Sequence, residues 1–266
     1  MPKEVVHLWL ADRVWEFFQS ISSIKISTAG KILFLIGSLF PDSFFYSPFP
    51  THYTTGDNLH KFEGRAFYET VKNNIWDSAT PEEKAFLAGI IAHFLADGHW
   101  HPIINDVAQK MADKSPGGYS QVFYHRLLES FMQAHLVSRS EQDERIRWLA
   151  AHYHEATSVA TSVLSKLSPF VNSGKKLSKT DLRIVIFCHE MSLRGLHSSI
   201  MREKRTWFLG KRSFESFSPL IPPPDDEYSS FATSIPAERE KVDFIFSNQS
   251  VEEYIRIVSS LSHELQ

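Results

Sequence analysis

Apolar residues recur along most of the chain with the spacing of a helix. In the segment from Val5 to Ile21 they fall three or four residues apart, at Val6, Leu10, Val14, Phe17 and Ile21. This spacing places them on one helical face. The same period returns over residues 29–39, 80–100, 119–137 and 251–265, and no segment alternates as a strand does. The pattern predicts an all-α fold.

Capping residues and prolines predict where the helices begin and end. Thr80-Pro81-Glu82-Glu83 combines an N-cap, a proline in the first turn and a capping-box glutamate. Ser140–Asp143, Ser178–Asp181 and Ser250–Glu253 predict further helix starts by the same logic. Pro48 and Pro50 predict a loop over 41–59, and 114–118 is expected to be a turn.

The expected organisation is one domain over residues 1–266. Residues 1–138 would form the metal-binding half, and 139–266 a helical C-terminal half with a Pro/Ser-rich loop at 208–236. Of the 266 residues 42% are hydrophobic, enough for one large core or two closely joined ones. The net charge of -3 and the lack of a basic block argue against broad nucleic-acid binding. A single cysteine, Cys188, and no apparent signal sequence predict a cytoplasmic protein.

Histidine is unusually abundant, with 13 in the chain, and the central group is His93-x-x-x-Asp97-x-x-x-His101. Residues four apart on a helix project from one face. Asp97 could therefore bridge two metal ions, with each histidine bound to a different ion. Pro102 is expected to loosen the helix at His101 and to free that side chain.

A second pair with this spacing, His125 and Glu129, supports a metal site. A single His-x-x-x-Asp pair is more often an exposed polar pair or a simple hydrogen bond. Here the apolar neighbours, such as Phe86 and Leu95, indicate a buried helix. A buried carboxylate between histidines needs a compensating charge, which a metal supplies. The two pairs together favour the metal interpretation.

These residues, with Gly37-Ser-Leu-Phe-Pro41-Asp42 before them and Pro102 after, resemble the zinc-dependent phospholipase C superfamily. That group includes bacterial phosphatidylcholine-hydrolysing phospholipases C and the N-terminal domain of glycosylphosphatidylinositol-specific phospholipase D. The fungal single-strand nucleases are similar. The resemblance covers roughly residues 1–135 and implies a multi-helix bundle around a buried metal cluster.

The resemblance implies metal ligands at eight positions. These are His7, Asp42, His60, His93, Asp97, His101, His125 and Glu129, with His52 as the alternate to His60. Asp42 is also the implied general base. Secreted members use their N-terminal amine as a ligand, whereas here six residues precede His7. The segment between His101 and His125 is longer than in those enzymes, so a loop at 110–120 is expected to reshape the mouth of the site.

The implied function is a metal-dependent phosphoric ester hydrolase, a phospholipase C-like phosphodiesterase that uses a zinc-activated hydroxide. Two zinc ions are expected, and a third could sit at His125 and Glu129. The substrate would be a phosphate ester such as a phospholipid, with transient contact to a membrane surface and no obligate protein partner. The alternatives are a single-strand nuclease-like phosphodiesterase and a non-catalytic metal-binding protein.

Three further features are not assigned as ligands. His99 lies off the face of the ligand histidines and is expected to support them or to face solvent. His189 is expected to be a hydrogen-bonded core histidine that could orient a ligand. The aromatic segment Phe44–Phe49 could touch lipid or a cation, although packing beneath the loop is the favoured interpretation.

Overall fold

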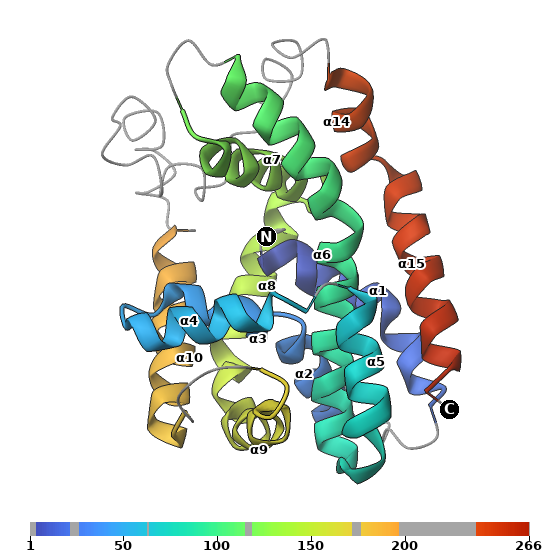
Figure 1. Ribbon diagram of the computed structural model, residues 1–266, viewed down its shortest axis with the longest axis vertical. Helices are drawn as coiled ribbons and strands as arrows, with labels where there is room; N and C mark the ends of the chain where they lie inside the picture. Colours follow the sequence, from blue (N-terminus) through green and yellow to red (C-terminus); the bar gives the residue numbers. More distant parts are fainter. Residues whose placement is uncertain are drawn as a thin grey trace.

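The computed structural model describes residues 4–21, 27–62, 64–114, 119–171, 177–196 and 238–265, and within them every regular element is a helix (Figure 1). This confirms the predicted all-α class. The longer helices are α1 (Glu4–Gln19), α2 (Thr28–Gly37), α4 (Pro50–Leu59), α5 (Arg65–Asn74), α6 (Pro81–Asp113), α7 (Gln121–Leu136), α8 (Arg139–His152), α9 (Thr157–Leu167), α10 (Lys179–Leu196) and α15 (Asn248–His263). The short ones are α3 (Phe40–Ser43), α14 (Arg239–Ile245), η1 (Phe44–Tyr46), η2 (Trp76–Ser78) and η3 (Tyr153–Ala156).

Helix α6 is the axis of the fold, and it contacts α1, α2, α5, α7, α9, α14 and α15 (Figure 1). All side chains from Ala85 to Asp97 are buried, so this part of the helix has neighbours on every side. The helix begins at the predicted capping box. Thr80 Oγ1 accepts from the Glu83 N–H at 3.2 Å, and the Glu83 carboxylate accepts from the Thr80 N–H at 2.7 Å.

The closest helix pair, α2 and α6, meets at two glycines. A Cβ on Gly37 would lie only 3.3 Å from the Cα of Gly89, and a Cβ on Gly89 would overlap the carbonyl oxygen of Phe34. Only glycine allows the two backbones to come this close. The crossing lies one turn before His93 and brings the end of α2 against the site.

The expected loosening of the helix at Pro102, and its end near residue 100, are wrong, because α6 continues through Pro102 to Asp113. Proline removes one backbone donor from the helix interior. Trp100 and Ile104, on either side, are fully buried and hold both halves of the helix in place. Residues 110–113 of the expected mouth loop are therefore helical, whereas 115–118 lie outside the described residues.

The loop expected over 41–59 is also wrong, since most of these residues form α3, η1 and α4. Pro41 and Pro50 lie in the first turns of α3 and α4. In a first turn the missing N–H has no helical partner to lose, so proline can begin a helix there. Gly56 lies within α4, where it packs closely on Phe44. Any side chain there would place its Cβ 2.9 Å from the Cβ of Phe44, which is too close.

Two of the other predicted helix starts are shifted. Helix α8 is capped by Ser138 with Glu141, and α15 by Ser247, so the true caps precede the predicted ones by two and three residues. The start at Ser178 is confirmed, because Ser178 Oγ accepts from the Asp181 N–H at 3.2 Å and Asp181 accepts from the Ser178 N–H at 2.8 Å.

Helix α15 packs along α6 and closes the bundle on the side away from α10 (Figure 1). The Tyr254 hydroxyl donates to the Ala92 carbonyl at 3.1 Å. His99 Nε2 lies 3.0 Å from the Ser250 carbonyl oxygen, so this histidine joins α6 to α15 and is half-buried. The predicted loop at 208–236 lies outside the described residues. Among the described helices, none combines the length and apolar character that crossing a bilayer requires.

Candidate metal centre

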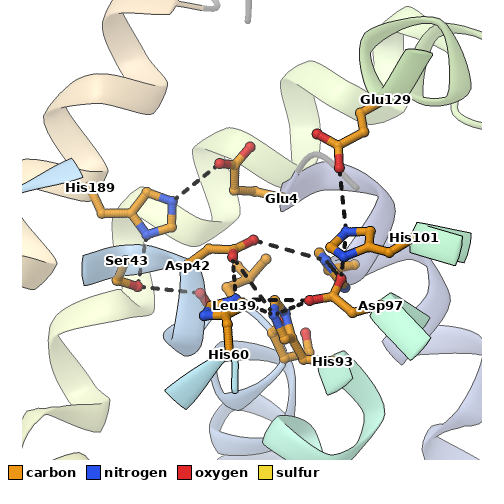
Figure 2. Close-up of polar contacts among 12 residues, drawn as sticks. Glu4, Leu39, Asp42, Ser43, His60, His93, Asp97, His101, Glu129 and His189 are labelled. Atoms are coloured by element: carbon orange, nitrogen blue, oxygen red, sulfur yellow. Dashed lines mark hydrogen bonds and ion pairs between the residues drawn. The ribbon is translucent and has the colours of Figure 1, made fainter. Parts of the chain in front are cut away.

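The histidines and acids expected at the site come together from separate helices (Figure 2). Helix α1 contributes His7, α3 contributes Asp42, and His60 caps the end of α4. Helices α6 and α7 supply the other members of this cluster, His93, Asp97, His101, His125 and Glu129.

Asp97 lies at the centre of the cluster, and its two carboxylate oxygens face different pairs of imidazoles. Oδ1 is 3.5 Å from His7 Nε2 and 3.4 Å from His101 Nε2. Oδ2 is 3.2 Å from His93 Nε2 and 3.8 Å from His60 Nε2. This arrangement suits a carboxylate that bridges two ions.

Asp42 faces the same histidines from α3. Its Oδ1 is 3.1 Å from His60 Nε2 and 3.7 Å from His93 Nε2, and its Oδ2 is 3.9 Å from His7 Nε2. The side chain is fully buried. Two carboxylates thus enclose the imidazoles of His7, His60 and His93.

Backbone carbonyls fix the orientation of two of these rings. His93 Nδ1 lies 2.9 Å from the Ser38 carbonyl oxygen, and His60 Nδ1 lies 2.9 Å from the Gly56 carbonyl oxygen. A carbonyl only accepts, so both Nδ1 atoms carry hydrogen and both Nε2 atoms are left to offer lone pairs. These Nε2 atoms face each other at 3.3 Å. Such facing lone pairs require a cation or a proton between them.

The cluster leaves an unusual group of buried polar atoms without a hydrogen bond. They are His7 Nε2, Asp42 Oδ2, both carboxylate oxygens of Asp97, and His101 Nε2. A buried polar group without a partner costs about 1–3 kcal/mol. Imidazole nitrogens and carboxylate oxygens are the ligands that zinc accepts. The residues present therefore fit zinc ions.

Burial and neighbouring charges set the protonation of the cluster. Burial lowers the pKa of His7 to about 3 and that of His101 to about 4. Burial alone would raise the pKa of Asp42, but His93 and His60 hold it at about 2. Against the effect of burial, Asp97 and Asp42 raise the pKa of His93 to about 9. Near neutral pH the carboxylates of Asp42 and Asp97 are ionised, and His7 and His101 are neutral, as metal ligands must be. His93 holds a proton in the metal-free protein and would release it when metal binds.

A third group consists of His101, His125 and Glu129. His125 Nε2 is 2.8 Å from Glu129 Oε1, and its Nδ1 is 2.8 Å from the side-chain oxygen of Asn105. His101 Nε2 lies 3.6 Å from the same Glu129 oxygen. His125 is hydrogen-bonded through both ring nitrogens, in contrast with His7 and His101.

His52, the alternate to His60, does not belong to the cluster. Its Nδ1 is 2.7 Å from Ser47 Oγ, and its Nε2 is 3.5 Å from Asp181 Oδ1 at the start of α10. The side chain is buried and links α4 to α10. The structure thus brings His60, and not His52, to the other expected ligands.

The sequence did not reveal the groups that orient the ligands. Two of them are the backbone carbonyls of Ser38 and Gly56, and a carbonyl leaves no mark in the residue type. Asn105, beside His125, lies one turn beyond His101 on α6. A polar residue four positions after a candidate ligand is a pattern that could have identified it.

Members of the cluster differ in how far they reach solvent. His101, His125 and His60 keep 24%, 17% and 16% of their side-chain surface exposed, whereas His93 and Asp42 keep none. The Phe45 ring lies 5.0 Å from the His60 ring. Phe44 is fully buried, so the packing interpretation of the aromatic segment holds for this residue.

Comparison with known proteins identifies the family of the chain. A family model described as zinc dependent phospholipase C matches residues 6–176. Neither the curated proteins nor the solved structures contain a match. The matched segment is more than half of the 266 residues and contains all eight members of the cluster. The chain therefore belongs to the zinc-dependent phospholipase C family.

Proposed function

We propose that the protein is a zinc-dependent phosphodiesterase of the phospholipase C type. Its active site would be the cluster of eight histidines and acids described above. The observation that carries this proposal is the set of buried, unbonded ligand atoms around Asp97. Buried polar atoms in folded proteins nearly always have a hydrogen-bond partner, so a group of such atoms without partners is explained by an ion that binds them.

The ligands divide into two sets around the bridge. Asp97 Oδ2, Asp42 Oδ1, His60 Nε2 and His93 Nε2 would hold one zinc ion. Asp97 Oδ1, His7 Nε2 and His101 Nε2 would hold the other. The first set offers four protein ligands and the second three. An ion with three protein ligands keeps a position for water or substrate.

Bound zinc supplies Lewis-acid chemistry, which acidifies a coordinated water and neutralises charge on phosphate oxygens. The chain contributes the geometry around that chemistry. Asp42 Oδ2 has no hydrogen-bond partner and lies beside His7, so it can orient a water and accept its proton. The low pKa of Asp42, about 2, keeps its carboxylate ionised and able to accept this proton.

The substrate would enter on the side of His60, His101 and His125, where the cluster is exposed. At this side Phe45 packs against His60, and the Phe45 ring also meets Tyr53 at 5.1 Å. Tyr53 is half exposed. These rings would contact the group attached to the phosphate, which suits a phospholipid head group or its glycerol.

Metal content and a substrate panel test the proposal together. Wild-type protein should contain at least two zinc equivalents by elemental analysis and should hydrolyse p-nitrophenyl phosphocholine. His60→Ala should lose zinc, whereas His52→Ala is the matched control, since His52 is a buried histidine of the same helix region that lies outside the cluster. Equal loss of zinc in both variants would contradict the ligand assignment.

The same panel separates the alternative functions. Hydrolysis confined to single-stranded DNA or RNA would replace the phospholipase activity with a nuclease activity. Zinc binding without hydrolysis of any phosphodiester would leave a metal-binding protein of the same fold.

A further inference from the structure

A second buried polar cluster lies directly behind Asp42 and contains a histidine from the C-terminal part of the chain (Figure 2). We call it the His189 network. Its members are Glu4 at the start of α1, Ser43 in α3, Tyr46 in η1, Tyr153 in η3 and His189 in α10. His189 lies beyond the segment 6–176 that the family model matches.

His189 is completely buried and contacts the network through both ring nitrogens. Nδ1 is 3.0 Å from Ser43 Oγ and 3.1 Å from the Tyr153 hydroxyl. Nε2 is 3.8 Å from Glu4 Oε1, which also accepts from the Tyr46 hydroxyl. The Tyr46 ring stacks on the imidazole, with ring centres 4.5 Å apart.

The two ring nitrogens of His189 are held differently. Nδ1 lies within hydrogen-bond distance of the Ser43 and Tyr153 hydroxyls, and the two hydroxyls also contact each other. Nε2 is buried and faces the Glu4 carboxylate at 3.8 Å, a distance too long for a hydrogen bond. The ring therefore cannot turn without breaking the buried contacts at Nδ1 and moving Nε2 away from Glu4.

The two ring nitrogens of His189 contact residues of α3 and α1, and each of these helices carries a member of the metal cluster. Ser43 directly follows Asp42, and Glu4 lies one turn before His7 on α1. Asp42 Oδ2 and His7 Nε2 are 3.9 Å apart, and neither atom has a hydrogen bond of its own. No direct hydrogen bond between these two atoms therefore fixes this distance in the absence of metal, whereas His189 connects the two elements that carry them.

We propose that His189 is a positioning residue of the metal centre, which holds the α1 and α3 segments so that His7 and Asp42 face the same ion. This inference rests on the metal centre of the proposed function. Partners behind the ligands typically change metal affinity 10–100-fold when they are removed. We expect a loss of that order in His189→Ala.

The test is cobalt binding, which reads the geometry of the site without substrate. Metal-free His189→Ala should bind Co²⁺ about 10–100-fold more weakly than wild type and show a shifted visible absorption band. His189→Asn can place a polar atom near the position of Nδ1, so it should recover part of the affinity and of the spectrum.

Lys166→Met is the matched control for lost stability. Lys166 binds the buried Glu83 at 2.6 Å, near the start of α6 and away from the cluster. This variant should lower the melting temperature but leave the cobalt spectrum and affinity as in wild type. If His189→Ala does not fold, Ser43→Ala breaks the other end of the same contact and should shift the spectrum in the same way.

The outcomes distinguish the existence of the metal centre from the positioning role of His189. Wild-type protein that shows no cobalt absorption would overturn the metal centre itself. A wild-type spectrum and affinity in His189→Ala, His189→Asn and Ser43→Ala would overturn the positioning role alone. A spectrum changed equally by Lys166→Met would reduce His189 to a general contributor to stability.

Discussion

Asp97 is the residue at which the metal centre can be tested most sharply, because both of its oxygens are buried, unbonded and aimed at histidines. Asp97→Asn keeps the shape of the side chain and removes its charge. One of the two oxygens becomes an amide nitrogen, which cannot bind metal. One set of ligands then loses a member, and both ions lose a negative charge.

The size of the effect follows from linkage. Zinc at 100 times its dissociation constant stabilises the folded chain by about 2.7 kcal/mol per ion, so two ions contribute about 5 kcal/mol. A chain of 266 residues gains about 2 °C in melting temperature per kcal/mol, so zinc should raise the wild-type value by about 10 °C. Loss of a partner behind a ligand weakens binding 10–100-fold, and loss of a ligand should exceed about 100-fold. Because the bridging carboxylate would serve both ions, its change should weaken both by this amount, which leaves about 0.4 kcal/mol per ion and a zinc-dependent rise of about 2 °C or less in Asp97→Asn.

Thermal unfolding with zinc and with a chelator measures this difference within each variant, so changes in the metal-free stability cancel. Asp12→Asn is the matched control, because Asp12 forms a partly exposed ion pair with Lys31 at 2.7 Å, away from the cluster. It should keep the full rise. Retention of more than half the rise in Asp97→Asn would refute the bridging role, and a wild-type protein that zinc does not stabilise would refute the metal centre.

Other predictions concern the stability of the helices around the site and its dependence on pH. Gly89→Ala should destabilise the protein by about 1–3 kcal/mol in denaturant unfolding, because its Cβ would overlap the Phe34 carbonyl and separate α2 from α6; an unchanged midpoint would show that the crossing can relax. Thr80→Ala should lose about 1 kcal/mol, since the N-terminus of α6 would keep only half of its capping box, and a stability equal to wild type would exclude this contribution. The metal-free protein should lose stability as the pH falls below 6.5. There the unfolded chain takes up protons at His7 and His101, whereas the folded chain, with pKa values of about 3 and 4, does not. Each residue contributes at most about 1.4 kcal/mol per pH unit down to pH 4, and denaturant titrations at pH 6.5 and 5 that coincide would contradict this.

Local geometry explains which parts of the site were predictable from the sequence. His93, Asp97 and His101 share one helical face because they are spaced four residues apart. The helix continues through Pro102, so all three keep this face. Pro48 and Pro50 predict a loop over 41–59, yet proline can both begin and interrupt a helix, and Pro50 begins α4. Only packing decides between these roles, here the close contact of Gly56 in α4 with Phe44.

Tertiary contacts account for what the sequence did not reveal. The carbonyls of Ser38 and Gly56 orient His93 and His60, yet any residue would supply the same carbonyl. His189 was expected to be a hydrogen-bonded core histidine, and this is confirmed, but its partner Ser43 is 146 positions away in the chain. No local pattern connects residues at such a separation.

The position of His101 bears on how many ions the cluster can hold. Its Nε2 lies 3.4 Å from Asp97 Oδ1 and 3.6 Å from Glu129 Oε1. His101 therefore lies between the two ligand sets that share Asp97 and the third group, which contains His125 and Glu129. An imidazole nitrogen has one lone pair and can bind one ion. If His101 completes the set of His7 and Asp97, the third group keeps only His125 and Glu129, which already contact each other at 2.8 Å. Two protein ligands fall short of the three or four of ordinary zinc sites. With His101 assigned in this way the cluster would hold two ions; if His101 instead joined His125 and Glu129, with which it forms a group of three possible ligands, a third ion could bind there.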